Sequence, residues 1–201
     1  MKKKILVPIA CGTEEMEAVT VIDMMTRAGY EVTVASADFD GKLTLTASRG
    51  VILGAQCRLV DVADEQFDVI VLSGGVAGAE TFRDSPILIE MLKQHMYEGK
   101  LVAAICAAPA LVLQHHNLYP QAIMTCHPNF MSHIAEQNWR PKRVTYDVNH
   151  NLLTSQGPGT ALEFAMEIII LLSGKQHARQ VAEPMVTVTV PVLNYHKLGD
   201  E

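Results

Sequence analysis

Residues 101–110 read Leu101-Val102-Ala103-Ala104-Ile105-Cys106-Ala107-Ala108-Pro109-Ala110, and the architecture of the chain can be inferred from them. Its first five residues are all apolar, which predicts a strand buried on both faces, as in a parallel sheet covered by helices. The small residues and the proline after Cys106 predict that a helix begins at once. A strand, a cysteine and a helix in direct succession are typical of a nucleophile elbow.

Strand and helix patterns alternate on both sides of this stretch. Nearly continuous apolar runs predict further strands of the sheet at 4–9, 31–35 and 68–72. Helices are predicted at 14–28, with Thr13 as its N-cap, and at 86–98, 107–116 and 160–172, the last ended by Gly174. A hairpin is expected at 144–155 and a small antiparallel excursion at 43–53. This alternation predicts an α/β protein of three layers.

The composition limits the classes of function. The chain has 201 residues, 49% of them apolar, and 16 basic against 22 acidic side chains give a net charge of −6. The length fits one domain at 1–185 with a C-terminal extension or surface tail at 186–201, and the acidic balance argues against a stable nucleic-acid complex. The longest apolar run, 101–113, is shorter than the roughly 18 residues that cross a membrane. Four cysteines without a CxxC pair predict reduced thiols in the cytoplasm.

The junctions after the strands hold the candidate catalytic residues, because the carboxyl ends of parallel strands meet at one edge of the sheet. A thiol at a helix N-terminus, such as Cys106, can have its pKa lowered to roughly 3.5–7.5, although a cysteine that ends a core strand can also simply pack. Glu17 lies at the edge of the apolar stripe of its helix, where burial would raise its pKa. A solvated helix flank is the other interpretation. Both pairs of alternatives are open at this point.

Three other features are less specific. Gly74-Gly75 after the third strand can bring N–H groups to a ligand or simply make a turn. His127 could orient a group near Cys106 or be a structural histidine, whereas Cys11 and Cys57 are expected to be core or partly buried thiols. The sequence has no GxGxxG, no P-loop and no histidine spacing typical of a metal site, so it predicts neither a cofactor nor a metal.

Taken together, the junctions resemble the ThiJ/PfpI superfamily, which is related to the class I glutamine amidotransferases. The resemblance rests on five motifs in register over about residues 4–185. They are GTEEME at 12–17, SRG at 48–50, DVIVLSGG at 68–75, AAICAAP at 103–109 and LTSQGPGT at 153–160. The pattern is most similar to the Parkinsonism-associated deglycase branch and, within it, to bacterial YajL-type proteins.

The resemblance implies a flavodoxin-like sandwich that forms a homodimer, with Cys106 as the reactive cysteine and Glu17 as its protonated partner. It implies that the N–H groups of Gly75 and Ala107 bind an oxyanion. Three more positions match residues near the family's site: Arg27 and Arg49, close also to the dimer contact, and His127.

The function implied is a cofactor-independent enzyme that acts on methylglyoxal, glyoxal and their early adducts on protein side chains or nucleotides. Such a deglycase, or glyoxalase III-like hydrolase, releases 2-hydroxy acids in the defence against carbonyl and oxidative stress. The alternative is a non-enzymatic redox-sensing chaperone in which Cys106 is oxidised to a sulfinate. A protease is a weaker interpretation, because no His–acid pair completes a triad in register.

Overall fold

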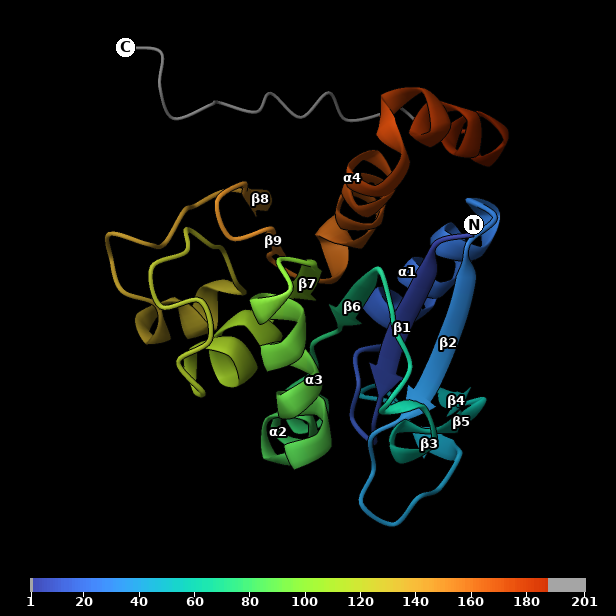
Figure 1. Cartoon of the computed structure of the whole chain (residues 1–201), viewed down its shortest axis with the longest axis vertical. Coiled ribbons are helices and arrows are strands. Elements are labelled where there is room, and N and C mark those ends of the chain that lie inside the picture. Colours follow the sequence, from blue (N-terminus) through green and yellow to red (C-terminus); the bar gives the residue numbers. More distant parts are fainter. Residues whose placement is uncertain (1, 188–201) are drawn as a thin grey trace.

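A computed structural model describes residues 2–187, in which a seven-stranded sheet forms the centre (Figure 1). The strand order is β5-β2-β1-β6-β7-β9-β8, and every strand is parallel to its neighbours except β8, which is antiparallel to β9. The strands are β1 (Lys4–Ile9), β2 (Glu31–Ser36), β5 (Cys57–Arg58), β6 (Val69–Leu72), β7 (Leu101–Ile105), β8 (Val144–Asp147) and β9 (Leu152–Ser155).

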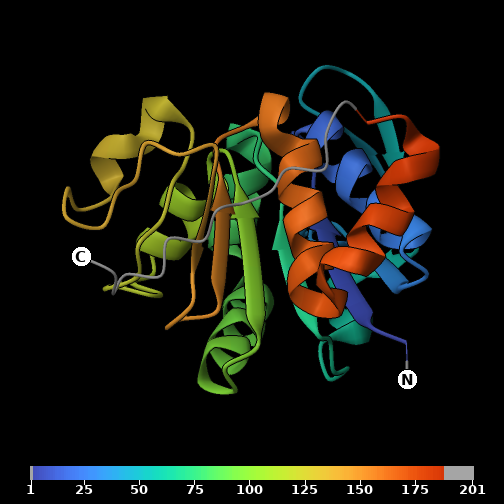
Figure 2. The same cartoon turned by 90° about the horizontal axis from the view of Figure 1, so that it is seen from above.

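Helices cover both faces of the sheet. They are α1 (Glu15–Arg27), α2 (Val76–Asp84), α3 (Pro86–Tyr97), the short π-type helix η2 (Pro109–Gln114) and α4 (Ala161–Ala182). Short 3₁₀ turns lie at Leu59–Val62, Pro128–His133, Pro158–Thr160 and Glu183–Met185. Helix α4 packs beside α1 (Figure 2), whereas α2 contacts both α3 and η2. The predicted flavodoxin-like α/β sandwich is therefore confirmed.

The direction of the chain reverses between β1 and β6. From β1 the chain passes through α1 to β2 on one side, and from β6 it passes through α2 and α3 to β7 on the other. Because such crossovers are right-handed, opposite directions place their helices on opposite faces of the sheet. The carboxyl ends of β1 and β6 then border a crevice, which is where open α/β sheets place their ligands.

A separate hairpin lies above this crevice. Its strands are β3 (Thr44–Thr46) and β4 (Ile52–Gly54), which confirms the predicted antiparallel excursion. Two backbone hydrogen bonds, from the Gly12 N–H to the Thr46 carbonyl and from the Ser48 N–H to the Thr13 carbonyl, attach the hairpin to the start of α1. The turn that carries Arg49 is thereby held over the end of β1.

Two predicted helix limits are wrong. Glu14 is the N-cap of α1, because its side chain accepts the Glu17 N–H at 2.8 Å, while the Thr13 hydroxyl accepts the Ala10 N–H instead. Gly174 breaks the last helix with a φ of +84°, but helical structure resumes and reaches Ala182. The sequence also gave no signal for α2 or for the two-residue edge strand β5.

Most of the predicted extension at 186–201 lies outside the described residues. Within residues 2–187, no helix is long and apolar enough to cross a membrane.

We predict that Gly78→Ala destabilises the protein by about 1–3 kcal/mol, as overpacking of a tight contact does. A Cβ on Gly78 would lie 2.7 Å from both Cα and N of Thr13, so the backbone before α1 would have to move. Gly159→Ala is the control, since a Cβ there meets nothing within 4 Å. Urea denaturation should separate the two variants; equal midpoints would contradict this account of the contact between α2 and the loop after β1.

Candidate active site

Cys106 lies at a strained turn between β7 and η2. Its φ is +64°, a left-handed conformation that side chains other than glycine and asparagine rarely adopt. Its N–H donates to the Ser155 carbonyl at 3.0 Å and its carbonyl accepts the His127 N–H at 2.8 Å, so both neighbouring segments hold the turn. The residue is 9% exposed. This is the geometry of the nucleophile elbow that the sequence predicted.

Glu17 is fully buried and faces the same turn. Its Oε2 accepts the Gly74 N–H at 2.6 Å, and its carboxyl is hydrogen-bonded to the Cys106 thiol. Burial raises the pKa of Glu17 to about 8, and the nearby charge of Glu14 adds to the rise. The structure thus supports the buried alternative over the solvated helix flank, and the carboxyl holds its proton at neutral pH.

Gly74 makes the approach of these two groups possible. A Cβ on Gly74 would lie 2.5 Å from the Cys106 Cβ, 2.9 Å from its Sγ and 3.0 Å from the Glu17 Oε2. Any side chain at this position would therefore displace the thiol, the carboxyl or both. The first glycine of the pair is required by this packing, which the sequence alone did not distinguish from an ordinary turn.

The sulfur also receives backbone N–H groups. Those of Gly75 and Ala107 form hydrogen bonds with the Cys106 side chain and act to lower its pKa. Gly75 has a φ of +80°, and a Cβ there would lie 2.1 Å from the Gly12 carbonyl oxygen, so only glycine fits. The two residues predicted to form an oxyanion site do converge on one atom.

The predicted direction of the Cys106 pKa is wrong. Burial raises the pKa of the thiol to about 12, and the charge of an ionised Glu17 adds to the rise, so these effects outweigh the N–H groups. The pair therefore holds both protons at neutral pH. When it loses one of them, the remaining proton is shared by the carboxyl and the sulfur, and the state with the proton on Glu17 contains a thiolate.

His127 lines the same cavity as Cys106. Its backbone N–H holds the Cys106 carbonyl, and its Nδ1 accepts the Asn129 N–H at 3.2 Å, which fixes the ring. The structure brings His127 to the site but shows no hydrogen bond between its ring and the thiol or Glu17. Its predicted catalytic role stays a prediction.

The two predicted arginines are placed differently. Arg49 lines the cavity, and its backbone N–H donates to Glu15 at 2.8 Å, while the Ser48 hydroxyl donates to the same carboxylate at 2.7 Å. Burial acts to raise the pKa of Glu15, but these hydrogen bonds outweigh it and hold the pKa below its usual value. Arg27 lies at the far end of α1, paired with Asp23, and does not line the cavity.

Glu14 and Glu15, at the start of α1, are both buried. One other sequence-based expectation needs correction. Cys11 is exposed and Cys57 half-buried, so the expectation of a core or partly buried thiol is wrong for Cys11.

The cavity in front of Cys106 has a volume of about 750 Å³. Its wall includes Asn129 and Phe130, which the sequence did not single out. The only signal for these two residues is that they lie two and three positions after His127. Among residues 2–187, no group of three His, Cys, Asp or Glu side chains is arranged to hold a metal.

The site thus consists of a cysteine on a strained strand-to-helix turn, beside a buried acid from the first helix. This arrangement places the protein in the class of α/β proteins with a nucleophile elbow. Residues 3–171 match the model of the DJ-1/PfpI family. The chain belongs to this family, which confirms the superfamily identified in the sequence, whereas the similarity to bacterial YajL-type proteins stays a prediction.

Similar proteins support the DJ-1 branch. Protein DJ-1 homolog B of Arabidopsis thaliana is 39% identical over 185 residues, which cover 92% of this chain and 41% of that protein. The chain spans less than half the length of the Arabidopsis relatives it matches. Glutathione-independent glyoxalase DJR-1.2 of Caenorhabditis elegans is 28% identical, over 86% of this chain and 89% of that protein. The crystal structure of VC2308 protein is 49% identical, with a TM-score of 0.90 over 94% of this chain and 95% of that chain.

We predict that the free energy of unfolding contains a pH-dependent contribution from Glu17. Its pKa is higher in the folded than in the unfolded chain, so the contribution is complete below about pH 4.5 and is lost as pH rises through about 8. The loss is roughly 5 kcal/mol. Urea denaturation should measure it in the Cys106→Ala background, which removes the coupled thiol.

The control is Glu17→Gln in the same background. His95, whose pKa burial lowers to about 4, titrates in both variants and cancels in the difference. If both variants show parallel pH dependences between about pH 4.5 and about pH 8, Glu17 does not hold a proton in the folded protein.

Proposed function

We propose that this protein is a cofactor-independent cysteine enzyme that converts methylglyoxal, glyoxal and their early adducts into 2-hydroxy acids. The observation that carries the proposal is the convergence on the Cys106 sulfur of the Glu17 carboxyl and two backbone N–H groups. Membership of the DJ-1/PfpI family and the name of the glyoxalase relative support the same reaction.

The reactive form is the pair that has lost one proton to solvent: the ionised Glu17 carboxylate takes the thiol proton, and the sulfur attacks the aldehyde carbon of methylglyoxal. A C–S bond forms and the carbonyl electron pair moves to oxygen. The N–H groups of Gly75 and Ala107 stabilise this alkoxide, since they already point to the position of the sulfur.

In the second step the hydrogen on the attacked carbon is removed as a proton, and the adjacent ketone carbon receives a proton through an enediol. Glu17 carries the proton between these positions. The aldehyde carbon is thereby oxidised and the ketone carbon reduced, so no external oxidant is needed. Water then cleaves the thioester, releasing lactate from methylglyoxal, or glycolate from glyoxal, and restoring the thiol.

The cavity is large enough for adducts as well as free dicarbonyls. Its volume of about 750 Å³ falls in the range of small-molecule sites, and Arg49 and Phe130 on its wall are placed to contact the amine, guanidine or thiol part of an adduct. That part leaves with a proton when its bond to the dicarbonyl carbon breaks. All four cysteines are free, which suits a reducing, cytoplasmic location.

We predict that Cys106→Ser and Glu17→Gln each lower lactate formation from methylglyoxal at least about 100-fold, the usual scale for loss of a nucleophile or a general acid–base. Lactate is measured enzymatically after subtraction of the uncatalysed rate. Cys57→Ser, on the edge strand β5, is the thiol control and should retain wild-type turnover.

Normal turnover by either site variant would overturn the mechanism. If the wild-type protein forms no lactate, but mild peroxide adds two oxygen atoms to Cys106 alone in an intact-mass measurement, the redox-sensing chaperone is the better account.

The homodimer belongs to the same proposal. Four exposed apolar side chains lie on α1 and the adjoining hairpin, namely Met16 (60% exposed), Val19 (47%), Val51 (49%) and Ile52 (61%). The hydrogen bonds between the hairpin and the start of α1 join these elements into one surface. Apolar side chains gathered beside an active site are typical of a protein–protein contact.

We predict that the protein sediments at twice the mass of the chain and that Ile52→Glu shifts it to the monomer. A charge inside an apolar interface has no partner and weakens association. The control is Val60→Glu. The Val60 side chain is 53% exposed but lies outside α1 and the hairpin, so this variant should remain dimeric in sedimentation equilibrium. A dimeric Ile52→Glu variant would place the interface on another surface.

A further inference from the structure

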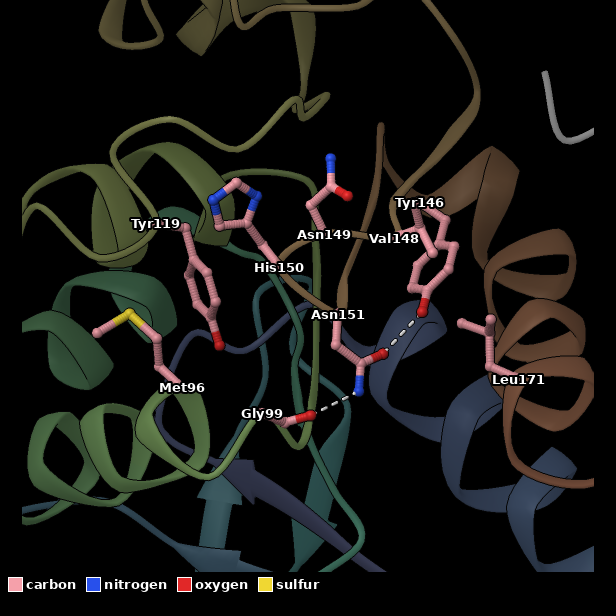
Figure 3. A pocket seen from close by; sticks show the side chains of 9 residues that line it. All are labelled: Met96, Gly99, Tyr119, Tyr146, Val148, Asn149, His150, Asn151 and Leu171. Atoms are coloured by element: carbon pink, nitrogen blue, oxygen red, sulfur yellow. Dashed lines mark hydrogen bonds between the residues drawn. The ribbon is translucent and has the colours of Figure 1, made fainter. Parts of the chain in front are cut away.

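A second cavity, of about 560 Å³, lies at the end of β7 opposite Cys106 (Figure 3). Its wall includes the turn at 148–151, which joins β8 to β9. Gly99, which precedes β7, also lines the cavity. Leu152, directly after the turn, pairs with Val102 near the start of β7, which sets the turn at the amino end of the strands. None of the residues that line this cavity lines the Cys106 cavity.

Tyr119 is the residue of this cavity that the fold does not explain. It is 1% exposed, and its hydroxyl has no hydrogen-bond partner within residues 2–187. Burial raises the pKa of the phenol, which therefore stays neutral and can donate as well as accept. In Figure 3 the hydroxyl points toward the side of the cavity where Gly99 lies. A buried hydroxyl without a partner is unfavourable, and phenylalanine would avoid that cost.

The backbone of Tyr119 is also unfavourable. Its φ is +56°, in the left-handed region, where a bulky residue is an outlier and glycine would be unstrained. Strain of this kind persists where the surrounding structure holds it, and it clusters at ligand sites. Both costs are offset if the hydroxyl bonds to a molecule in the cavity.

An amide group lies across the cavity from this hydroxyl. Asn151 is fixed by two hydrogen bonds, because its Oδ1 accepts from the Tyr146 hydroxyl at 2.9 Å and its Nδ2 donates to the Gly99 carbonyl at 3.0 Å (Figure 3). Asn149 also lines the cavity, but its amide points away from the Tyr119 hydroxyl in Figure 3. The His150 ring stands edge-on to Tyr119, with ring centroids 6.5 Å apart and an interplanar angle of 88°. A fixed amide and perpendicular rings favour a flat ligand that both donates and accepts hydrogen bonds.

The cavity lining has no lysine, arginine, aspartate or glutamate. The His150 Nδ1 lies 3.1 Å from Asp147 Oδ1, which already accepts the N–H groups of Asn149 and His150. Apolar side chains, including Met96 and Leu171, complete the wall. An ionised ligand group would therefore find no opposite charge in the lining, whereas a neutral ring would be accommodated.

We propose that this cavity binds a neutral, nitrogen-containing aromatic ring of the nucleobase class, hydrogen-bonded by the Tyr119 hydroxyl and the Asn151 amide. The volume of about 560 Å³ is within the range of small-molecule sites and accommodates a purine with its ribose. A phosphate group would meet no cation in the lining, so the nucleoside should bind better than the nucleotide. The proposal does not depend on the reaction at Cys106.

The test is saturation-transfer NMR of the full chain with adenosine. We expect adenosine to bind with a Kd of about 1 mM or tighter, adenosine 5′-monophosphate to bind more weakly, and Tyr119→Phe to weaken adenosine binding at least fivefold. Because that variant removes an unpartnered hydroxyl, its melting temperature without ligand should equal or exceed that of the wild type. Cys106→Ser is the matched control and should bind adenosine as the wild type does.

Three results would overturn the proposal: no saturation transfer up to the solubility limit of adenosine, equal affinity in a folded Tyr119→Phe variant, or an equal loss of affinity in Cys106→Ser, which would assign the binding to the catalytic cavity.

Discussion

The buried carboxyl of Glu17 is the group on which the arrangement of the active-site edge depends. It has no exposed surface, so its charged form is unfavourable and its proton is retained to about pH 8. Its bond to the Gly74 N–H fixes the end of β6, and its contact with the thiol requires that residue 74 have no side chain. One desolvated acid thus determines a loop conformation, a residue identity and the protonation state of the neighbouring sulfur.

The sheet topology explains why these groups meet although they are far apart in the sequence. Glu17 follows β1, Gly74 follows β6 and Cys106 follows β7, and these three strands are neighbours in the sheet. The reversal of chain direction between β1 and β6 leaves their carboxyl ends uncovered by a crossover connection. The hairpin that carries Arg49 then closes this edge through hydrogen bonds to the start of α1.

The sequence predicted those features that depend on local pattern, and it missed those that depend on distant partners. Strand β7 and the elbow follow from an apolar run that ends at a cysteine. Helix α2 was missed because its buried face includes Gly78, so the apolar pattern of a helix is incomplete there. A glycine is needed at this position because the backbone of Thr13 lies against it. The burial of Glu15 depends on partners more than thirty residues away. The pKa of Cys106 was predicted in the wrong direction because helix position is local, whereas burial is a property of the whole fold.

Backbone strain links the two cavities. The non-glycine residues with positive φ in the described part of the chain are Cys106, Asn117, Tyr119, Asn151 and Val186, the last at the border of that part. Asparagine tolerates this conformation, so Asn117 and Asn151 require no further account. At Cys106 the strain aims the sulfur at two backbone N–H groups and a carboxyl, and the chain itself supplies every partner. At Tyr119 the same backbone conformation orients a hydroxyl for which residues 2–187 supply no partner. The physical account of Tyr119 is therefore incomplete without a molecule from outside the chain.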